Sequence, residues 1–433
     1  MQNRKTRIAI IIEVKKRELP FFSILEEVLK KEGYEVKLIS FRSMCTWHIL
    51  CFRPDIIIVN GIRTTDPYFY GQIALPKYLF SARVVCYYSE QIGYYNESVA
   101  RGYNNNTILD NVDFHVGWGP RFLEDLRTMG VPLEKLWYIG SLQYDIDLYH
   151  NENSATIKNK FSKKFGINKN KNWILYADNI VKRYQPEKLY EGRRLDSFNV
   201  IKKVAEENPD SLVIFRPHPD TSKEEMERIK KFFENNNNII FNNKEHVYYW
   251  TLCSKAVIIW CSTSSIQAMF LGKPIFGFMT SDKQDMKKYW YRDILPLYDD
   301  YNQLANDVRQ TLQGKVPTLE STTRTNRKKY VEDWYFAKDG CSFNRFVSLM
   351  RIVEKSNFVP IDKKQITFGI FTFVRILAVE IRSFIGDCVR RRIFSRIITR
   401  REINKEKKKY DLSRYKHMDF IVKQSESGKF FDL

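Results

Sequence analysis

Short apolar runs alternate with amphipathic stretches along most of the chain, and this alternation predicts an α/β protein. In the first half we expect β-strands at residues 7–14, 34–40, 55–60, 83–88, 113–118 and 136–140. The stretch 21–32 has apolar positions at helical spacing and ends before Gly33, a favourable residue just beyond a helix C-terminus. Strands that alternate with helices in this way form a parallel sheet covered on both faces.

A polar stretch rich in Asn and Lys, residues 151–172, interrupts this rhythm and is interpreted as an interdomain linker containing one short helix. The alternation then resumes. We expect strands at 173–177, 211–215, 238–241, 256–260 and 274–278, and helices at 193–208, 222–234 and 264–271. The pattern predicts two doubly wound domains, as a chain of 433 residues suggests. The expected boundaries are an N-terminal domain 1–150, a linker 151–172, a C-terminal domain with return helices 173–355, and a tail 356–433.

The tail carries much of the chain's positive charge. Residues 366–389 are apolar but interrupted by charges, and residues 388–416 contain 12 Lys/Arg against 3 Asp/Glu, an excess of 12 − 3 = 9 within the total of +20. An apolar helix in the lipid headgroup layer, followed by a basic run on anionic lipid, fits this pattern. We therefore expect residues 366–416 to bind the inner face of the cytoplasmic membrane, making the protein cytoplasmic and peripheral. The alternative is a core helix with a solvated basic extension.

A net charge of +20 favours polyanionic partners in general. Nucleic acid is not expected, because the tail lacks interleaved aromatic residues and no helix-turn-helix or RNA-binding signature is present. The seven cysteines are scattered without CxxC or Cys/His spacing, which gives no support to a zinc site or a disulfide framework. No Gly-x-Gly-x-x-Gly follows the first strand, which argues against a dinucleotide enzyme.

Polar residues that follow the strands of the second domain are the first candidates for a site. Arg216, His218 and Pro219 come directly after the strand expected at 211–215. Imidazole and guanidinium groups suit a phosphate, and the prolines stiffen the loop that carries them. The alternative is a proline turn with a surface histidine.

Two further clusters are expected at the same edge of the second sheet. Four consecutive small hydroxyl residues open the helix expected at 264–271, whereas N-capping needs one; they are Ser262, Thr263, Ser264 and Ser265. Asp178 and Asn179 follow the strand expected at 173–177, with cations beyond at Lys182 and Arg183. All are expected to contact a donor nucleotide or its phosphate, although a solvated loop explains Asp178 and Asn179 equally well.

The first domain offers a candidate general base. Glu90 follows the strand expected at 83–88, where a carboxylate can take the proton of an acceptor hydroxyl. We expect Gly93 and Asp145 on the same acceptor side. The alternatives for the base are Asp66, Glu97 and Asp145. An ion-pair or helix-capping role is equally compatible with any single one of them.

Together these motifs resemble the GT-B enzymes of bacterial surface-carbohydrate synthesis: capsule Kdo transferases, polysialyltransferases, and the CDP-glycerol glycerophosphotransferases of teichoic acid synthesis. In that group a His-Pro motif and a Ser/Thr-rich helix start bind the cytidine nucleotide's phosphate; His218-Pro219 and Ser262 to Ser265 match them. WILYA at 173–177, AMFLGKPIF at 268–276 and the run 116–145 are also similar to phrases of the group. The resemblance implies a GT-B fold, with two Rossmann-like domains facing each other across a cleft, plus a helical basic tail.

Two departures bear on the reaction. Ser89-Glu90-Gln91 stands where the teichoic acid enzymes carry a catalytic His-Gly-Thr, and Trp260-Cys261-Ser262-Thr263 where they carry Asp-Tyr-Ser-Ser. The first departure favours a carboxylate base, as in Kdo and sialic acid enzymes. We therefore expect inverting transfer of a sugar, such as CMP-activated Kdo or sialic acid, to a surface polysaccharide or lipid-linked glycan. In this reaction Glu90 acts as base and His218 stabilises the departing phosphate.

Two other functions stay open at this point. One is polyol-phosphate transfer of the CDP-glycerol type, and the other is non-catalytic binding of a polyanion or nucleotide. The nucleotide sugar is expected as a substrate, and no cofactor is expected. Metal independence is predicted because no Asp-x-Asp lies in a plausible loop.

Overall fold

The computed structural model describes residues 4–41, 44–61, 76–89, 91, 111–182, 186–262, 264–281, 294–315, 318–357, 377–378, 381–382 and 399–409. Two compact units share these residues. The first contains the chain up to Ile146 and again from Glu332 onward, and the second contains Asp147–Val331. Each unit is built around its own six-stranded sheet in which every strand pairing is parallel.

The first unit has the strand order β2-β1-β3-β4-β5-β6. Its strands are β1 (Arg7–Ile12), β2 (Glu35–Ser40), β3 (Ile56–Asn60), β4 (Arg83–Tyr87), β5 (Phe114–Gly117) and β6 (Leu136–Tyr138). All of β3, and all of β1 except Arg7, is buried, as expected of central strands covered on both faces. These strands are the apolar runs predicted from the sequence.

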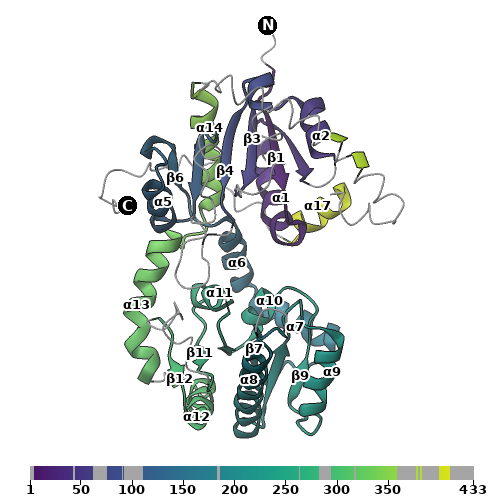
Figure 1. Ribbon diagram of the computed structural model, residues 1–433, viewed down its shortest axis with the longest axis vertical. Helices are drawn as coiled ribbons and strands as arrows, with labels where there is room; N and C mark the ends of the chain where they lie inside the picture. Colours follow the sequence, from purple (N-terminus) through teal and green to yellow (C-terminus); the bar gives the residue numbers. More distant parts are fainter. Residues whose placement is uncertain are drawn as a thin grey trace. The chain divides into compact units, whose positions relative to one another are not determined.

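Helices from distant parts of the chain belong wholly or partly to this unit (Figure 1). They are α1 (Lys15–Lys31), α2 (Cys45–Phe52), α5 (Pro120–Thr128), α6 (Leu142–Glu152), α14 (Ser342–Lys355) and α17 (Arg400–Lys407), with a 3-10 turn at Leu133–Lys135. In α14, Phe346 packs edge-on against Tyr87 of β4. The sequence predicts that the helical segment from 301 to about 355 returns across the domain junction, and the buried apolar face of α14 belongs to the first unit.

The second unit has the strand order β12-β11-β10-β7-β8-β9. Its strands are β7 (Asn172–Ala177), β8 (Ser211–Arg216), β9 (Ile239–Phe241), β10 (Ala256–Ile259), β11 (Ile275–Phe278) and β12 (Leu297–Tyr298). Its helices are α7 (Ser154–Phe165), α8 (Glu187–Glu207), α9 (Lys223–Phe232), α10 (Val247–Cys253), α11 (Ser264–Phe270), α12 (Tyr301–Leu312) and α13 (Thr318–Tyr335), which ends in the first unit. α8 packs with α12, and α7 and α11 each pack with α10 (Figure 1). The doubly wound α/β architecture predicted for both halves is confirmed.

The stretch 151–172 differs from the linker expected from its composition. It contains the end of α6 and all of α7, and the boundary between the units falls after Ile146, inside α6. Phe161 of α7 is buried edge-on against Trp250 at 4.9 Å between ring centroids. Phe165 also contacts Trp250, at 5.3 Å between ring centroids, and Ile157 packs against a buried cluster that includes Tyr248, so the apolar face of α7 makes it part of the second unit.

The tail is described chiefly at 399–409, where α17 packs on α1. Thr399 caps α17, and Ile403 is buried. Lys407 lies 3.0 Å from a Glu26 carboxylate oxygen and 2.7 Å from one of Glu27. Most of the expected membrane segment 366–416 lies outside the described residues. Among the helices that are described, none is long and apolar enough to cross a bilayer.

Candidate functional site

In the second unit, three loops that carry predicted site residues leave the carboxyl edge of neighbouring strands. β7 lies between β10 and β8, and Ala177 at its end is level with Ile259 and Arg216. In parallel α/β sheets ligands bind at this edge. The register therefore brings the loops after β7, β8 and β10 to one place, as the sequence predicted.

Hydrogen bonds join these loops directly. The Asp178 backbone N–H donates to the Arg216 carbonyl at 3.0 Å. The Asn179 side-chain amide donates to the Cys261 carbonyl at 2.7 Å. Asn179 therefore lies where it was expected, and its side chain holds the β7 loop against the serine turn that follows β10.

His218 lies in the loop between β8 and α9, with a side chain that is 26% exposed. Its Nδ1 accepts the Asp220 backbone N–H at 3.2 Å, and its carbonyl accepts the Thr221 N–H at 3.0 Å. A ring nitrogen that accepts a backbone N–H is unprotonated, so the proton of the neutral ring is assigned to Nε2. Nε2–H is then the group that can donate to an anion. Pro219, inside this turn, restricts the backbone beside His218.

The guanidinium of Arg216 is engaged with backbone carbonyls and not with the site where His218 can donate to an anion. Its guanidinium donates to the carbonyls of Asn242 at 3.3 Å, Lys244 at 3.5 Å and Glu245 at 2.7 Å, in the loop between β9 and α10. Burial lowers the pKa of Arg216 to about 10, although Glu245 opposes the shift. We interpret Arg216 as a tie between two loops and not as the phosphate contact expected from the sequence.

The serine turn precedes and opens α11. Ser262 Oγ accepts the Ser264 backbone N–H at 3.3 Å, and Ser265 Oγ donates to the Ser262 carbonyl at 2.8 Å. Ser262 and Ser265 are buried, and Ser264 is half-buried. Cys261 has a φ of 46°, a left-handed conformation that is costly for a residue other than glycine. Thr263 lies outside the described residues.

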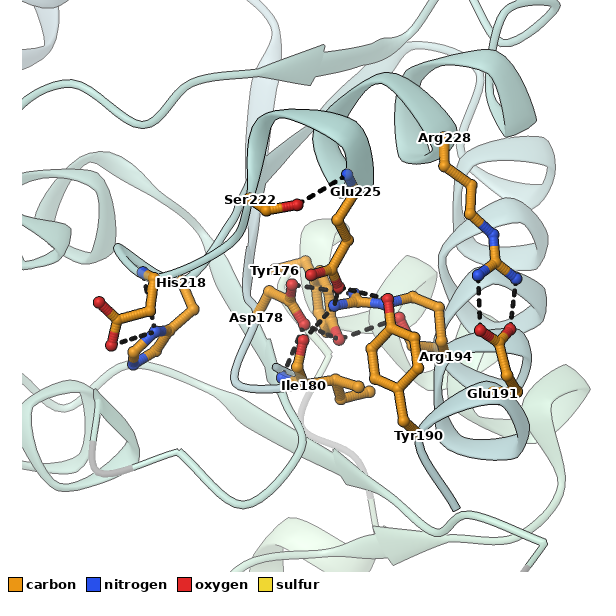
Figure 2. A network of polar contacts seen from close by, with 12 residues as sticks. Tyr176, Asp178, Ile180, Tyr190, Glu191, Arg194, His218, Ser222, Glu225 and Arg228 are labelled. Atoms are coloured by element: carbon orange, nitrogen blue, oxygen red, sulfur yellow. Dashed lines mark hydrogen bonds and ion pairs between the residues drawn. The ribbon is translucent and has the colours of Figure 1, made fainter. Parts of the chain in front are cut away.

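Asp178 is the centre of a buried network (Figure 2). Its Oδ2 lies 2.9 Å from Nη1 of Arg194, whose side chain is 1% exposed. Its Oδ1 accepts the Ile180 N–H at 3.1 Å and lies 3.1 Å from the Tyr176 hydroxyl. Both carboxylate oxygens are therefore engaged, so we interpret Asp178 as structural and not as the nucleotide contact expected from the sequence.

The same arginine reaches a second carboxylate. Arg194 Nη2 lies 2.6 Å from Glu225 Oε1, which also accepts the Tyr190 hydroxyl at 2.5 Å. Arg194 Nη2 donates to the Ile180 carbonyl as well. Arg194 and Tyr190 belong to α8 and Glu225 to α9, so this network connects two helices with the loop after β7 (Figure 2).

At the carboxyl edge of the first unit, a buried carboxylate joins the ends of three strands. Glu18 accepts the Glu13 N–H beyond β1 at 2.8 Å and the Asn60 amide at the end of β3 at 2.6 Å. Asn60 in turn accepts the Ser89 N–H beyond β4 at 2.9 Å. Burial raises the pKa of Glu18, with Arg17 opposing the shift.

The acceptor-side candidates are described only in part. Asp145 is buried, and its carboxylate accepts the Ser342 hydroxyl at 2.8 Å and the Phe343 N–H at 3.2 Å, both in the first turn of α14. It therefore holds α14 in place, in contrast to the acceptor contact expected from the sequence. The other candidates lie outside the described residues: Glu90, Gly93, Asp66 and Glu97.

Comparisons with known proteins agree with this architecture. Residues 143–355 match the sequence model of a family described as CDP-Glycerol:Poly(glycerophosphate) glycerophosphotransferase. No curated protein matches the chain. The wall teichoic acid polymerase TagF has a similar solved structure, with a TM-score of 0.54 at 12% identity over 81% of this chain and 89% of that one. The fold is GT-B-like.

Two sugar-nucleotide enzymes have the same GT-B-like fold. One is described as a UDP-N-acetylglucosamine 2-epimerase from Listeria monocytogenes, with a TM-score of 0.56 at 14% identity over 83% of this chain and 99% of that chain. The other is UDP-GlcNAc 2-epimerase from Neisseria meningitidis, with a TM-score of 0.55 at 12% identity over 80% and 100%. At such identities the likeness concerns the fold alone.

The sequence predicts the site loops of the second unit but does not identify the residues that hold these loops in place. Arg194 and Glu225 lie in helices whose other charged residues are mostly at the surface, so neither carries a local signal of burial. Glu18 precedes the helix start expected at 21, and nothing in the sequence around it indicates that it is buried. Each became recognisable only through its partners in three dimensions.

Proposed function

We propose that the protein is a transferase that uses a CDP-activated polyol phosphate of the CDP-glycerol type and extends a cell-surface polymer. The observation that supports it most strongly is the family match over 143–355, which includes the carboxyl ends of β7, β8 and β10, with the His218 loop and the serine turn. That match favours phosphate transfer over the sugar transfer we expected from the sequence.

The proposed reaction needs anion stabilisation in one place. An acceptor hydroxyl oxygen forms a bond to the phosphorus that carries glycerol. The bond from that phosphorus to the bridging oxygen breaks, and CMP leaves with the electron pair. His218 Nε2–H donates to the leaving phosphate, where negative charge develops. Ser264, a half-buried residue of the turn after β10, is proposed to donate its hydroxyl to the same phosphate.

The acceptor proton goes to a base, for which Glu90 stays our candidate. The Ser89 N–H, held by Asn60, fixes the backbone directly before Glu90. We propose that the reaction proceeds without a metal ion, because the side chains named above supply both the proton acceptor and the anion contacts.

Transfer of a CMP-activated acidic sugar is the second candidate. It is favoured by one observation, namely that Ser89-Glu90-Gln91 stands where the teichoic acid enzymes carry His-Gly-Thr. A carboxylate in that place suits the sugar chemistry better. Both candidate reactions release CMP. They would therefore bind the donor nucleotide at the same carboxyl edge of the second sheet and differ in the group that is transferred.

We also propose that the basic tail holds the protein at an anionic membrane surface, where a lipid-linked acceptor would be found. The charge excess in residues 388–416 supports this proposal. Two of these cations already have a partner within the chain, because Arg400 and Lys407 pair with Glu26.

A thermal-shift comparison of CMP, CDP, UDP and GDP tests the donor assignment. We expect CMP and CDP to raise the melting temperature, since binding to the folded state stabilises it. The shift should disappear in His218→Ala and persist in His48→Ala, which removes an exposed histidine of the first unit. A shift with UDP but not with the cytidine nucleotides would refute the assignment.

A further inference from the structure

The five residues Pro217–Thr221, which include His218, form a loop whose two ends are held by one buried guanidinium. The loop begins after Arg216 at the end of β8 and finishes at Ser222, the N-cap of α9. Arg194 approaches it from α8, and the contacts on both sides of the loop end on this one side chain (Figure 2).

At the beginning of the loop, the contact runs through Asp178. Its backbone N–H donates to the Arg216 carbonyl at 3.0 Å, and its carboxylate lies 2.9 Å from Arg194 Nη1. At the far end, Ser222 Oγ accepts the Glu225 N–H at 3.2 Å, and the Glu225 carboxylate lies 2.6 Å from Arg194 Nη2. The loop, both carboxylates and the guanidinium therefore form a closed ring of contacts.

Stability alone is a poor explanation for this cluster. The side chains of Asp178, Arg194 and Glu225 are 0%, 1% and 8% exposed, and a buried ion pair often stabilises a fold no better than apolar residues of the same size. A guanidinium, however, is a rigid planar group with fixed donor directions. Placed between two carboxylates, it fixes the distance between the segments that carry them.

We propose that Arg194 and Glu225 are positioning residues that hold the His218 loop in the conformation needed at the donor phosphate. The inference rests on the proposed function, and it adds that Arg194 of α8 determines the position of His218 through its contacts at the two ends of the loop. Displacing a group by about 1 Å from its reacting partner can lower a rate by about 100-fold. Loss of the Glu225 contact should therefore reduce turnover more than donor binding.

The chain contains a matched control. Arg228 and Glu191 form a two-bonded ion pair, at 2.7 and 2.5 Å, that joins the same helices α9 and α8 (Figure 2). Their side chains are 52% and 41% exposed, and neither of these two bonds involves the loop. Breaking this pair removes a connection between the helices and leaves the loop contacts in place.

The experiment compares Glu225→Ala, Glu225→Gln and Arg228→Ala in the full chain. Both Glu225 variants lose the charge, but glutamine keeps an oxygen that can accept from Arg194 and Tyr190. We expect kcat for CMP release to fall about 10-fold or more in Glu225→Ala, with the donor KM within about 3-fold of the wild type. Glu225→Gln and Arg228→Ala should both stay near the wild-type kcat.

Hydrogen exchange of the peptide covering 217–222 provides a readout that does not depend on activity. It should accelerate in Glu225→Ala alone. If Glu225→Ala does not fold, Glu225→Asp, which keeps the charge but is one methylene shorter, takes its place with the same expectation. Equal loop exchange in the Ala and Gln variants, or an equal loss of kcat in Arg228→Ala, would overturn the proposal. Failure of the proposed function would appear differently, as a wild type without cytidine-dependent turnover.

Discussion

Asp145 shows how a single buried side chain can make stability depend on pH. Burial raises its pKa to about 7, although the Ser342 hydroxyl and the Phe343 N–H favour the charged form. Between its ordinary pKa of 3.8 and about 7, the folded chain keeps a proton that the unfolded chain releases. Rising pH therefore disfavours the folded state in this interval.

The test of this linkage compares the wild type with Asp145→Asn by urea unfolding at several pH values. The free energy of unfolding of the wild type, relative to that of Asp145→Asn, should fall as pH rises from about 4 to about 7, by up to about 1.4 kcal/mol per pH unit. A difference that stays constant, or grows with pH, would contradict the assigned shift.

At the residue scale, sequence identified positions better than roles. Asp178, Asn179 and His218 follow strands as predicted, because a polar residue after an apolar run marks the end of a strand. The partner of Asp178 could not be predicted, since Arg194 lies 16 residues away in a helix. Side-chain partners depend on how helices pack, and a single sequence does not specify this.

At the scale of elements, Glu18 connects the ends of β1, β3 and β4. Removing it in Glu18→Ala leaves the buried Asn60 amide and the Glu13 N–H without this acceptor, each at a cost of about 1–3 kcal/mol. We expect the free energy of unfolding to fall by about 3 kcal/mol, measured by chemical denaturation. Glu134→Ala, at an exposed position, should change it by less than about 0.5 kcal/mol.

A loss below about 1 kcal/mol in Glu18→Ala would show that the carboxylate does not hold these strand ends. Glu18→Gln should lower the free energy of unfolding by less than Glu18→Ala does, because glutamine replaces only one of the two acceptor oxygens with a donor.

The elements themselves were largely predictable. Every strand expected from an apolar run is present in the described parts of the chain, because central parallel strands are buried on both faces. β12 was missed because it is only two residues long. The sequence also did not predict that α7 belongs to the second unit, because its composition is typical of a linker. Contacts of Phe161 and Phe165 with Trp250 hold α7 in place, and composition does not reveal such contacts.

At the scale of the whole molecule, the basic tail has two possible partners. α17 pairs with acidic residues of α1, since Arg400 donates to Glu26 at 2.6 Å and Lys407 to Glu27 at 2.7 Å. Burial raises the pKa of Glu26, but hydrogen bonds from Lys30, Arg400 and Lys407 outweigh burial and lower it overall. Glu26 and Glu27 of α1 thus compete with any anionic lipid for the cations of α17.

Liposome flotation tests the membrane proposal. We expect the full chain to float with anionic vesicles at low salt, and a chain truncated after Pro360 to stay in solution. Glu26→Gln with Glu27→Gln should float at least as well as the wild type, because it frees α17 without removing a basic residue. Equal flotation of the full and truncated chains would defeat the proposal.

The central claim is that His218 stabilises the phosphate that leaves with CMP. The most direct measurement is CMP release from CDP-glycerol in the presence of a short poly(glycerol phosphate) primer, compared with release from CMP-activated acidic sugars. We expect release from CDP-glycerol to fall about 100-fold or more in His218→Ala and to be unchanged in His48→Ala. Undiminished release in His218→Ala would contradict the account.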